Sequence, residues 1–403
     1  MKHPSLSLLT ICASAYTACA QPPTYAFEEV PTLGGAESYT LAISNSGWAV
    51  GAAMNAQGVF KAIRYRNGQI ESLGALAGFQ HSSANGVNDA GHAVGLSSAS
   101  ANLLNPQPCL FRDGVVTNLN TGPTQIQSGH ARAINALDVI AGTGPFPPPS
   151  GYGACTWTPV PQTTGFVAQP LLFAPIVPCY SHAFDINDVG DTVGWFAPQG
   201  RCGGELPYVV RNGTATVLQT LGGANAEAYS LNNMGDAVGY SELSNGQRRA
   251  ALWRAGQVIN LGAIGSASFA QSINDAGDIV GYYIVNNRTR ACIWIDKVQF
   301  DLSNAAPPLG YSELHAFGIN DSGQIIGHCR DALGRLRGFV MTPTEAPRCF
   351  ADFNSDGGID GGDIEAFFIS WETGLGTADV NLDGGVDGGD VEHFFRRWVT
   401  GEC

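Results

Sequence analysis

One phrase recurs seven times between residues 43 and 327, and this repetition constrains the fold more than any other feature of the chain. Six copies read aliphatic residue, Asn or similar, Asp or similar, any residue, Gly, two further residues, Val or Ile, and a last Gly, and the third copy departs from this at Ala136, Asp138 and Ala141. The last glycines are Gly51, Gly95, Gly142, Gly194, Gly239, Gly281 and Gly327, spaced 44, 47, 52, 45, 42 and 46 residues apart. A repeat of this length holds one supersecondary unit that must stack on its neighbours.

Each period contains four short β-type runs separated by turn residues. In the fourth period these runs cover residues 182–186, 192–196, 207–210 and 216–221. Between the first two runs, Asn-Asp-x-Gly reads as a tight turn, because Asn and Asp bond their own backbone and Gly accepts positive φ. We therefore interpret the recurring Asp as a folding signal rather than a catalytic group. Four-stranded units at this period predict an all-β, seven-bladed β-propeller over residues 21–341.

The two ends of the repeat array complement each other. The last period stops after its third strand at residues 338–341, while residues 25–35 form a run that matches the fourth strand at residues 217–223. We predict that this N-terminal strand completes the last blade and closes the ring, leaving no open sheet edge.

Residues 1–20 read as a signal peptide. Lys2 supplies the positive start, residues 6–18 the apolar stretch, and Ala18-Cys19-Ala20 a small-residue cleavage site. Cys19 could instead be a lipidated first residue, but Tyr16 stands where such sites usually carry Leu, which favours cleavage. No later apolar run approaches the roughly 20 residues of a membrane helix. We expect a secreted, extracellular protein, free or attached to a cell surface, with no transmembrane segment.

The acidic charge is concentrated at the C-terminus. The net charge is −14, and residues 349–403 contain twelve acidic and two basic residues. The chain has no basic face for a phosphate backbone, so we expect no nucleic-acid partner.

Residues 349–403 contain two copies of a twelve-residue acidic loop, each followed by an amphipathic helix. Calcium takes hard oxygen ligands from alternate positions of such a loop. The first loop would use Asp352, Asn354, Asp356, the Gly358 carbonyl, Asp360 and Asp363, and the second Asp379, Asn381, Asp383, the Gly385 carbonyl, Asp387 and Asp390. The pattern predicts two bound Ca²⁺ ions as cofactors.

The two helices carry matching apolar faces. Ile364, Phe367, Phe368 and Trp371 follow helical spacing, and the same types recur 27 residues later. Cys349 and Cys403 bracket the unit, and a disulfide between them would close a domain too small for a large core. Such a closure would stabilise the folded domain by roughly 4 kcal/mol.

With Asp at position 12 of both loops, these helices and loops resemble a dockerin module, and the flanking cysteines with Gly401-Glu402-Cys403 resemble its GC-type variant. The resemblance implies a small α-helical domain at residues 349–403, joined by a linker at residues 342–348, with a cohesin-like or cell-surface protein as its partner. Loop positions 10 and 11, which choose the cohesin in many dockerins, are Gly361-Gly362 and Gly388-Gly389, so the partner's identity does not carry over.

A second resemblance covers the repeats. Ser181-His182-Ala183-Phe184-Asp185-Ile186-Asn187 and residues 314–320, with the step Leu221-Gly222-Gly223, resemble the HAF repeats of extracellular bacterial proteins. The resemblance implies an exported propeller-like domain and no particular reaction. The first three blades depart from the His-Ala-Phe triplet, so no shared role follows for it.

The variable loops between second and third strands are where a propeller would carry a site. His130, His182 and His315 occupy one slot of the repeat, and Glu227 fills that slot in the fifth blade. They would form a polar rim at the channel entrance, unless each simply caps its own turn or strand. Further acids expected on this face are Glu37, Glu205, Glu242 and Glu313. No nucleophile, phosphate-loop or zinc-protease pattern occurs, so no catalytic residue is assigned.

Eight cysteines remain after removal of the signal peptide, and an exported protein is expected to pair them. Cys179 and Cys202 belong to connections on one face of the fourth blade, which favours that pair. The sequence leaves open the partners of Cys109, Cys155, Cys292 and Cys329.

These patterns favour a secreted, non-catalytic binding propeller for a glycan or protein ligand, tethered by a calcium-dependent dockerin-like unit. One alternative is a carbohydrate-active hydrolase or lyase carried in a degradative complex, which would need two positioned carboxyl groups. Another is a structural cell-surface protein.

Overall fold

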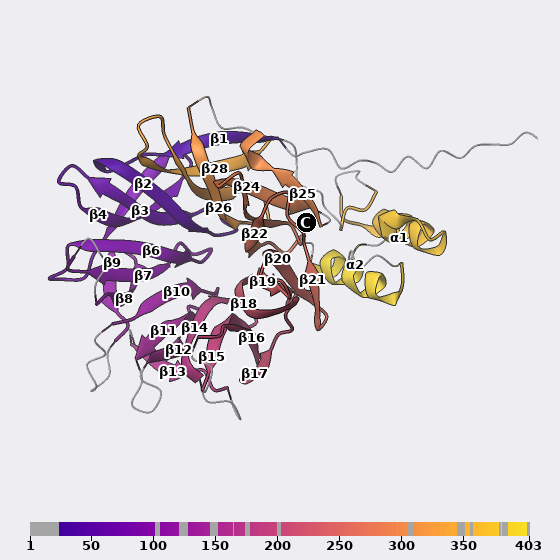
Figure 1. Ribbon diagram of the computed structural model, residues 1–403, viewed down its shortest axis with the longest axis horizontal. Coiled ribbons are helices and arrows are strands. Elements are labelled where there is room, and N and C mark those ends of the chain that lie inside the picture. Colours follow the sequence, from indigo (N-terminus) through magenta and orange to yellow (C-terminus); the bar gives the residue numbers. More distant parts are fainter. Residues whose placement is uncertain are drawn as a thin grey trace, which may run out of the picture.

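The structure is a computed structural model, and it describes residues 24–100, 105–120, 128–145, 152–163, 165–173, 178–199, 203–295, 297–304, 310–344, 351–354, 358–378, 380 and 386–400. Seven four-stranded antiparallel sheets form a seven-bladed β-propeller. The blades follow one another around the ring in chain order, and the first and last colours of the propeller meet where β1 lies beside β28 (Figure 1).

The strands fall into four classes by their position in the blade. The innermost strands are β2 (Gly34–Ile43), β6 (His81–Val87), β10 (His130–Ile134), β14 (Pro178–Ile186), β18 (Gly222–Leu231), β22 (Ala267–Ile273) and β26 (Ser312–Ile319). The second strands are β3 (Ala49–Asn55), β7 (Ala93–Ser98), β11 (Ile140–Pro145), β15 (Thr192–Pro198), β19 (Ala237–Leu243), β23 (Ile279–Val285) and β27 (Ile325–Arg330). The third strands are β4 (Phe60–Arg66), β8 (Gln107–Arg112), β12 (Tyr152–Pro159), β16 (Leu206–Arg211), β20 (Arg248–Arg254), β24 (Arg288–Ile295) and β28 (Leu336–Pro343). The outermost strands are β5 (Gln69–Gly74), β9 (Val115–Asn118), β13 (Phe166–Pro170), β17 (Thr214–Val217), β21 (Gln257–Asn260), β25 (Val298–Asp301) and β1 (Tyr25–Val30), and a short 3-10 turn, η1 (Leu302–Asn304), follows β25.

The N-terminal strand belongs to the last blade. β1 pairs antiparallel with β28, from Tyr25 opposite Pro343 to Val30 opposite Gly338. The first strand of the chain therefore lies outside the last strand of the array, as the unpartnered run at residues 25–35 predicted. The pairing also moves the predicted linker boundary, because Thr342 and Pro343 belong to β28 rather than to a linker.

The turn between the first two strands has the conformation that the repeat predicted. The first glycine of the phrase has positive φ in six blades, for example 89° at Gly190, and Asp138 takes φ 59° in the third blade. The last glycine of the phrase is required for a different reason, the close approach of two strands. A Cβ on Gly239 would lie 1.9 Å from the Glu227 carbonyl oxygen, and the equivalent contact is 1.9–2.1 Å in the other blades. Only glycine permits the second strand to approach the innermost strand so closely.

That close approach coincides with a β-bulge in every innermost strand. The register shifts by one residue at the same position in each blade, for example between Ala183 and Asp185 in β14. A bulge re-aims the side chain of its extra residue. The seven residues within these shifts are Leu41, Asn85, Arg132, Phe184, Tyr229, Gln271 and Phe317.

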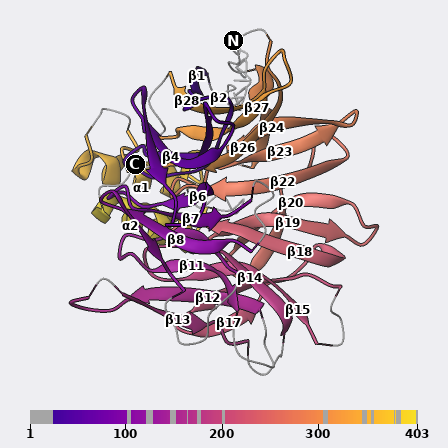
Figure 2. The same cartoon turned by 90° about the vertical axis from the view of Figure 1, so that its left-hand side faces the viewer.

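The hydrophobic core consists of seven clusters, one at each junction between neighbouring blades. Figure 2 shows the corresponding stacking of sheets from β14 to β24. Four cysteines belong to these clusters, and each lies in a different one: Cys109, Cys155, Cys292 and Cys329.

These four thiols are free, so the expectation that all eight mature cysteines pair is wrong. Each is fully buried in a separate interblade core and has no other of them within reach. Burial also raises the pKa of Cys109 to about 12. Cys179 is disulfide-bonded; its predicted partner Cys202, and the predicted pair Cys349–Cys403, lie outside the described residues.

Two helices follow the propeller, α1 (Gly361–Glu372) and α2 (Gly388–Thr400), with a 3-10 turn, η2 (Gly376–Ala378), between them. The predicted apolar faces pack on each other in one cluster. Phe367 stacks on Phe394 with 4.3 Å between ring centroids and 1° between ring planes. Of the helices described here, none is long and apolar enough to cross a membrane.

Candidate functional sites at the two ends of the channel

At one end of the channel, the turn asparagines form a hydrogen-bonded belt. Each side-chain Nδ2 donates to the backbone carbonyl of the equivalent turn residue in the next blade, at 3.0–3.2 Å. The same side chain's Oδ1 accepts a backbone N–H of its own turn at 2.8–3.1 Å. We call this set the Asn belt: Asn88, Asn135, Asn187, Asn232, Asn274 and Asn320.

The belt explains why the repeat carries Asn rather than Asp at this position. One amide supplies the acceptor for its own turn and the donor for the neighbouring blade, whereas a carboxylate is only an acceptor. The first blade is the exception. Ser44 has no amide nitrogen, and its junction with the second blade is made by Ser46, whose backbone N–H and hydroxyl bond Asp89 at 2.8 and 2.9 Å.

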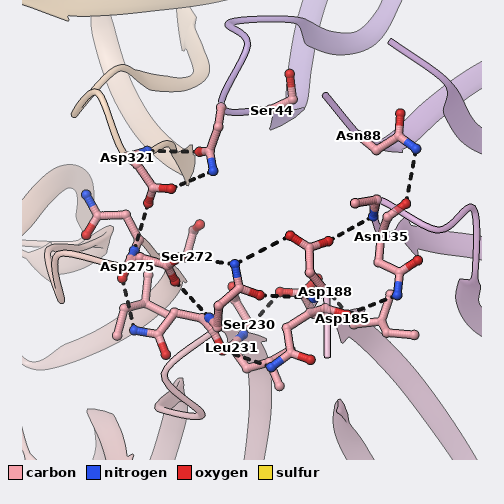
Figure 3. A pocket seen from close by; sticks show the side chains of 18 of the residues that line it. Ser44, Asn88, Asn135, Asp185, Asp188, Ser230, Leu231, Ser272, Asp275 and Asp321 are labelled. Atoms are coloured by element: carbon pink, nitrogen blue, oxygen red, sulfur yellow. Dashed lines mark hydrogen bonds between the residues drawn. The ribbon is translucent and has the colours of Figure 1, made fainter. Parts of the chain in front are cut away.

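The next residue of the phrase adds a second layer of contacts. The Asp188 carboxylate accepts the Ala136 backbone N–H at 2.8 Å, and Asp275 accepts that of Asn233 at 2.7 Å. Figure 3 shows these side chains reaching from one blade to the next. The recurring Asp thus has a structural contact between blades, in agreement with its interpretation as a folding signal.

The belt surrounds a polar pocket of about 190 Å³. Asp185 also lines it, at a position where the other blades carry Ala, Ser or Gly (Figure 3). Its carboxylate accepts the backbone N–H groups of Ile186 at 2.9 Å and Leu231 at 3.1 Å. Burial nevertheless raises the pKa of Asp185 to about 6. This pocket lies at the end opposite to the one where the sequence placed the site.

Toward the other end, aromatic rings of four consecutive blades form a continuous series. Neighbouring ring centroids lie 4.9–6.2 Å apart, and contacts such as Phe184–Tyr229 and Tyr282–His315 join one blade to the next. We call this series the aromatic arc: Tyr180, His182, Phe184, Trp195, Tyr229, Tyr240, Phe269, Tyr282, His315, Phe317 and His328. All of its residues lie on the first or second strand of their blades, and most are only partly buried.

Three of the four predicted rim residues lie in or beside this arc. His182 and His315 are members of it, and Glu227 pairs across the strands with Tyr240. His130 lies in the preceding blade, close enough to His182 for their charges to interact. The His182 ring reaches the neighbouring blade, where its Nδ1 lies 3.2 Å from the Thr143 hydroxyl.

These histidines are neutral at physiological pH. Burial, followed by the charge of Arg132, lowers the pKa of His130 and of His182 to about 4. Burial likewise lowers the pKa of His328 to about 4 and, in direction, that of His315. A neutral imidazole both donates and accepts a hydrogen bond.

Two carboxyl groups meet beside the arc. The Tyr240 hydroxyl donates to Glu205 at 2.6 Å and lies 3.3 Å from Glu227. Burial, followed by the nearby Glu205 charge, raises the pKa of Glu227 to about 8. Glu227 therefore keeps its proton at neutral pH.

Neighbouring groups hold this pair in place. The Asn225 amide oxygen accepts the Glu205 backbone N–H at 3.2 Å, and its amide nitrogen donates to Glu242 at 3.0 Å. Arg248 lies 3.8 Å from Glu242, with its guanidinium carbon 5.0 Å from the centroid of the Tyr240 ring. The groups that support the Glu205–Tyr240–Glu227 cluster thus come from three strands, β18, β19 and β20.

The other acids expected on this face are bound elsewhere. Glu313 forms an ion pair with Arg330 at 2.8 Å, and Glu37 accepts the Leu336 backbone N–H at 3.3 Å. Of the acids named from the sequence, only Glu205 and Glu227 converge with Glu242.

The C-terminal loops are described in part. Asp360 caps α1 and Asp363 returns a bond to its backbone at 2.8 Å, and Asp387 and Asp390 repeat this contact at α2. Both Asp363 and Asp390 are fully buried. Asp352, Asn354 and Gly358 are also described, whereas Asp356, Asp379, Asn381, Asp383 and Gly385 lie outside the described residues. Among the described residues, no three His, Cys, Asp or Glu side chains form a metal site.

Sequence reasoning missed the residues that give the arc its continuity. Phe184 and Tyr229 come from bulge positions, and Trp195, Tyr240 and Tyr282 from second strands. A period-2 pattern does not locate such residues, because the single extra residue of a bulge shifts the alternation by one. The triplet His-Ala-Phe was the available signal, since it places two rings on either side of the small buried Ala183.

No protein-family profile matches the chain, and no curated protein matches it. Several solved structures are similar in fold. YCF48 bound to D1 peptide has 13% identity and a TM-score of 0.48, covering 81% of this chain and 100% of that one. The β-propeller domain of the Trilobed protease from Pyrococcus furiosus has 9% identity and a TM-score of 0.47, covering 77% and 97%. TolB from Acinetobacter baumannii has 10% identity and a TM-score of 0.39, covering 75% of this chain and 65% of that chain.

Proposed function

We propose that this protein is a secreted, non-catalytic binding protein whose propeller holds a glycan at the aromatic arc and whose C-terminal unit attaches it, with two Ca²⁺ ions, to an extracellular partner or surface. The observation that carries the proposal is the arc itself. Aromatic faces that are partly exposed beside neutral imidazoles, amides and carboxyl groups suit a ligand with both C–H surfaces and hydroxyl groups. A sugar chain has both.

The carboxyl pair argues against the alternative of a glycoside hydrolase. The two carboxyl groups of such an enzyme stand about 5 Å apart or more, so that they flank the bond to be cleaved. Glu205 and Glu227 both contact the Tyr240 hydroxyl, at 2.6 and 3.3 Å. This shared contact with one phenol favours binding over hydrolysis.

The proposed calcium sites rest on the loop pattern and on the buried carboxylates. Asp363 is fully buried, receives two backbone N–H bonds, and forms no ion pair with Lys or Arg among the described residues. A buried carboxylate without a cation is costly, and a divalent ion would offset that cost. The indole nitrogens of Trp371 and Trp398 bond the backbone oxygens of Asp387 and Asp360 at 2.9 and 3.0 Å, so each helix steadies the other loop.

Binding to a panel of polysaccharides tests the propeller. We expect the full chain to be retained on at least one insoluble glycan without releasing reducing ends. Phe184→Ala and Phe317→Ala should weaken retention, whereas Phe60→Ala, which removes a ring from the first blade outside the arc, should not. Release of reducing ends would favour the hydrolase or lyase. Failure to bind any glycan would leave a protein ligand or a structural role.

Calcium titration of the full chain after chelation tests the tail. We expect two bound ions per chain, with one lost in Asp363→Asn and the other in Asp390→Asn. Asp113→Asn, at an exposed turn of the propeller, is the matched control and should bind both ions. Full binding by the first two variants would contradict the proposed ligand sets. Attachment to a cohesin-like partner is expected only with calcium present.

A further inference from the structure

A second polar pocket, of about 290 Å³, lies where the first and last blades of the ring meet. Its residues come from β1, β4 and β28 and from the turns after the innermost strands of the first and seventh blades. They include Glu28, Ser46, Arg66, Asn67, Gln324 and Thr342. No residue of the aromatic arc lines this pocket, so the two are separate parts of the propeller.

The arginine of this pocket stands in a position that three other blades also fill with arginine. Each of the four comes directly after the third-strand residue that pairs with the start of the second strand: Arg66, Arg112, Arg211 and Arg254. Three of them form an ion pair with a carboxylate of the propeller. The pairs are Arg112 with Asp138 at 3.2 Å, Arg211 with Asp191 at 3.0 Å, and Arg254 with Asp236 at 2.7 Å.

The first blade has an indole where two of these blades have the acid. Asp191 and Asp236 directly follow the first glycine of their phrase, and Trp48 stands at that position in the first blade. The Arg66 guanidinium carbon lies 3.8 Å from the centroid of the Trp48 ring, and one of its nitrogens donates to the Ser46 carbonyl at 3.3 Å.

Arg66 therefore differs from its three counterparts in lacking a carboxylate. It forms no ion pair in the described part of the chain. A guanidinium carries several N–H donors in one plane, and the protein accepts from only one nitrogen of Arg66. The remaining donors belong to a partly buried cation that lines a pocket.

We propose that this pocket is a second binding site of the propeller, for a sugar acid whose carboxylate pairs with Arg66 as Asp191 and Asp236 pair with their arginines. Arginine matches a carboxylate with two parallel N–H bonds. The contact with the Trp48 ring holds the guanidinium before a ligand arrives, which lowers the entropic cost of binding.

The rest of the lining favours a sugar acid over a peptide carboxylate. Ser46, Asn67, Gln324 and Thr342 offer hydroxyl and amide groups, which suit a ligand with several hydroxyls. The Glu28 carboxylate accepts the Tyr65 hydroxyl and forms no ion pair among the described residues, so it can also accept a ligand hydroxyl. The volume is near the lower limit of about 300 Å³ for ligand pockets, which suits one sugar residue. A hexuronate residue carries the carboxylate and the hydroxyls together.

The test compares trimers of galacturonate and of mannuronate with their methyl esters, which keep the sugar backbone and lack the charge. Isothermal titration of the full chain at neutral pH should show a preference of about tenfold or more for at least one acid over its ester, the size expected for a charge-assisted hydrogen bond. Equal affinity for acid and ester, or binding of neither acid, overturns the site. Acetyl-trialanine, which has a carboxylate and no hydroxyl group, should bind more weakly than that acid. Equal or tighter binding of the peptide overturns the assignment to a sugar acid.

Variants of the first blade locate the preference. Arg66→Gln should abolish it, and Arg66→Lys, which keeps the charge without the planar fork, should reduce it. Trp48→Asp leaves Arg66 in place and gives it an acid of its own, so this variant should abolish the preference as well. Arg211→Gln is the matched control, because it removes the equivalent arginine of the fourth blade, and it should leave the preference unchanged. A preference that survives Arg66→Gln overturns the proposal.

The same variants separate this site from the glycan site proposed at the arc. Phe184→Ala should weaken retention on the polysaccharide and leave the preference for the acid intact, whereas Arg66→Gln should do the opposite. Loss of the preference in a folded Phe184→Ala variant would place the acid at the arc and overturn the second site, while the proposed binding function would stand. Failure of the whole polysaccharide panel would overturn glycan binding at the arc without affecting the comparison of acid with ester.

Discussion

The two ends of the channel use the same strands for opposite purposes. At the belt end, six blades present the same Asn with the same two hydrogen bonds, and only Ser44 differs. A few residues away on the same innermost strands, the bulge positions carry Leu, Asn, Arg, Phe, Tyr, Gln and Phe. The repeated end joins the blades to one another, and the varied end places six different residue types beside the channel. Recognition is therefore expected where the repeat varies.

The largest effect should come from the belt. In Asn232→Asp the buried donor to the Asn274 carbonyl becomes a carboxylate facing an acceptor. We expect a loss of about 3 kcal/mol in the free energy of unfolding, from the orphaned carbonyl and the buried charge. Urea denaturation measures it, with Asn245→Asp at an exposed turn as the control. If Asn232→Asp lost no more stability than Asn245→Asp, the belt would not hold the blades together.

The bulge should be nearly as sensitive. In Gly239→Ala the new Cβ would lie 1.9 Å from the Glu227 carbonyl, so the first two strands must separate. We expect about 2 kcal/mol of destabilisation. The arc should suffer too, because Glu227 and Tyr240 would shift with the strands. Gly203→Ala, where an added Cβ meets no atom within 4 Å, should be neutral in the same denaturation experiment. Equal stability of both variants would contradict the close approach.

Between about pH 6.5 and pH 8, the arc end should give the protein a pH dependence that the belt end does not. The pKa of Glu227 is raised from 4.5 to about 8, so between these values the folded chain holds a proton that the unfolded chain has lost. The free energy of unfolding should fall as pH rises through this window. Asp185, with a pKa of about 6, adds to the fall only at lower pH, so the measurement belongs between about pH 6.5 and pH 8.

Glu227→Gln should flatten that decline, whereas Asn232→Asp, though less stable, should keep it. Urea denaturation at several pH values across the window measures both slopes. An unchanged slope in Glu227→Gln would show that Glu227 does not hold the proton that is lost across this window.

The smallest effect concerns the gap in the belt. Ser44→Asn restores the amide that the other six blades carry, and its Nδ2 should reach the Asn88 carbonyl. We expect a gain of about 1 kcal/mol in the free energy of unfolding, the net worth of one buried hydrogen bond. Ser44→Ala is the matched comparison and should lose the existing contact to the Trp48 backbone N–H. A destabilised Ser44→Asn would show that the first junction is built for Ser46 and Asp89 instead.

The repeat predicted the number of blades, the Asn-Asp-x-Gly turn and the N-terminal strand, because each depends on local spacing that the chain displays directly. It also placed His182 and Glu227 at equivalent positions. It did not predict that Asn187 bonds the next blade, since that contact joins residues 45 positions apart in sequence. Nor could it predict the arc. The meeting of Glu205 with Glu227 depends on the connection before β16, whose course the repeat does not determine.

The assignment of the cysteines failed for a related reason. Counting cysteines in an exported chain favours pairing, but Cys109, Cys155, Cys292 and Cys329 lie in four different interblade clusters. The number of cysteines carries no information on the distances between them. Cys109, Cys155 and Cys292 occupy equivalent third-strand positions, which are separated by a whole blade, so sequence equivalence argued against pairing among them.

The pairing of β1 with β28 determines how the ring would carry mechanical load. β28 is the strand from which the chain continues toward the C-terminal helices, and it is hydrogen-bonded to β27 on one side and to β1 on the other. A pull on the C-terminal segment acts along β28, so it must shear two ladders at once rather than peel a single edge strand. β1 thus holds in place the strand on which a tethered molecule would be pulled.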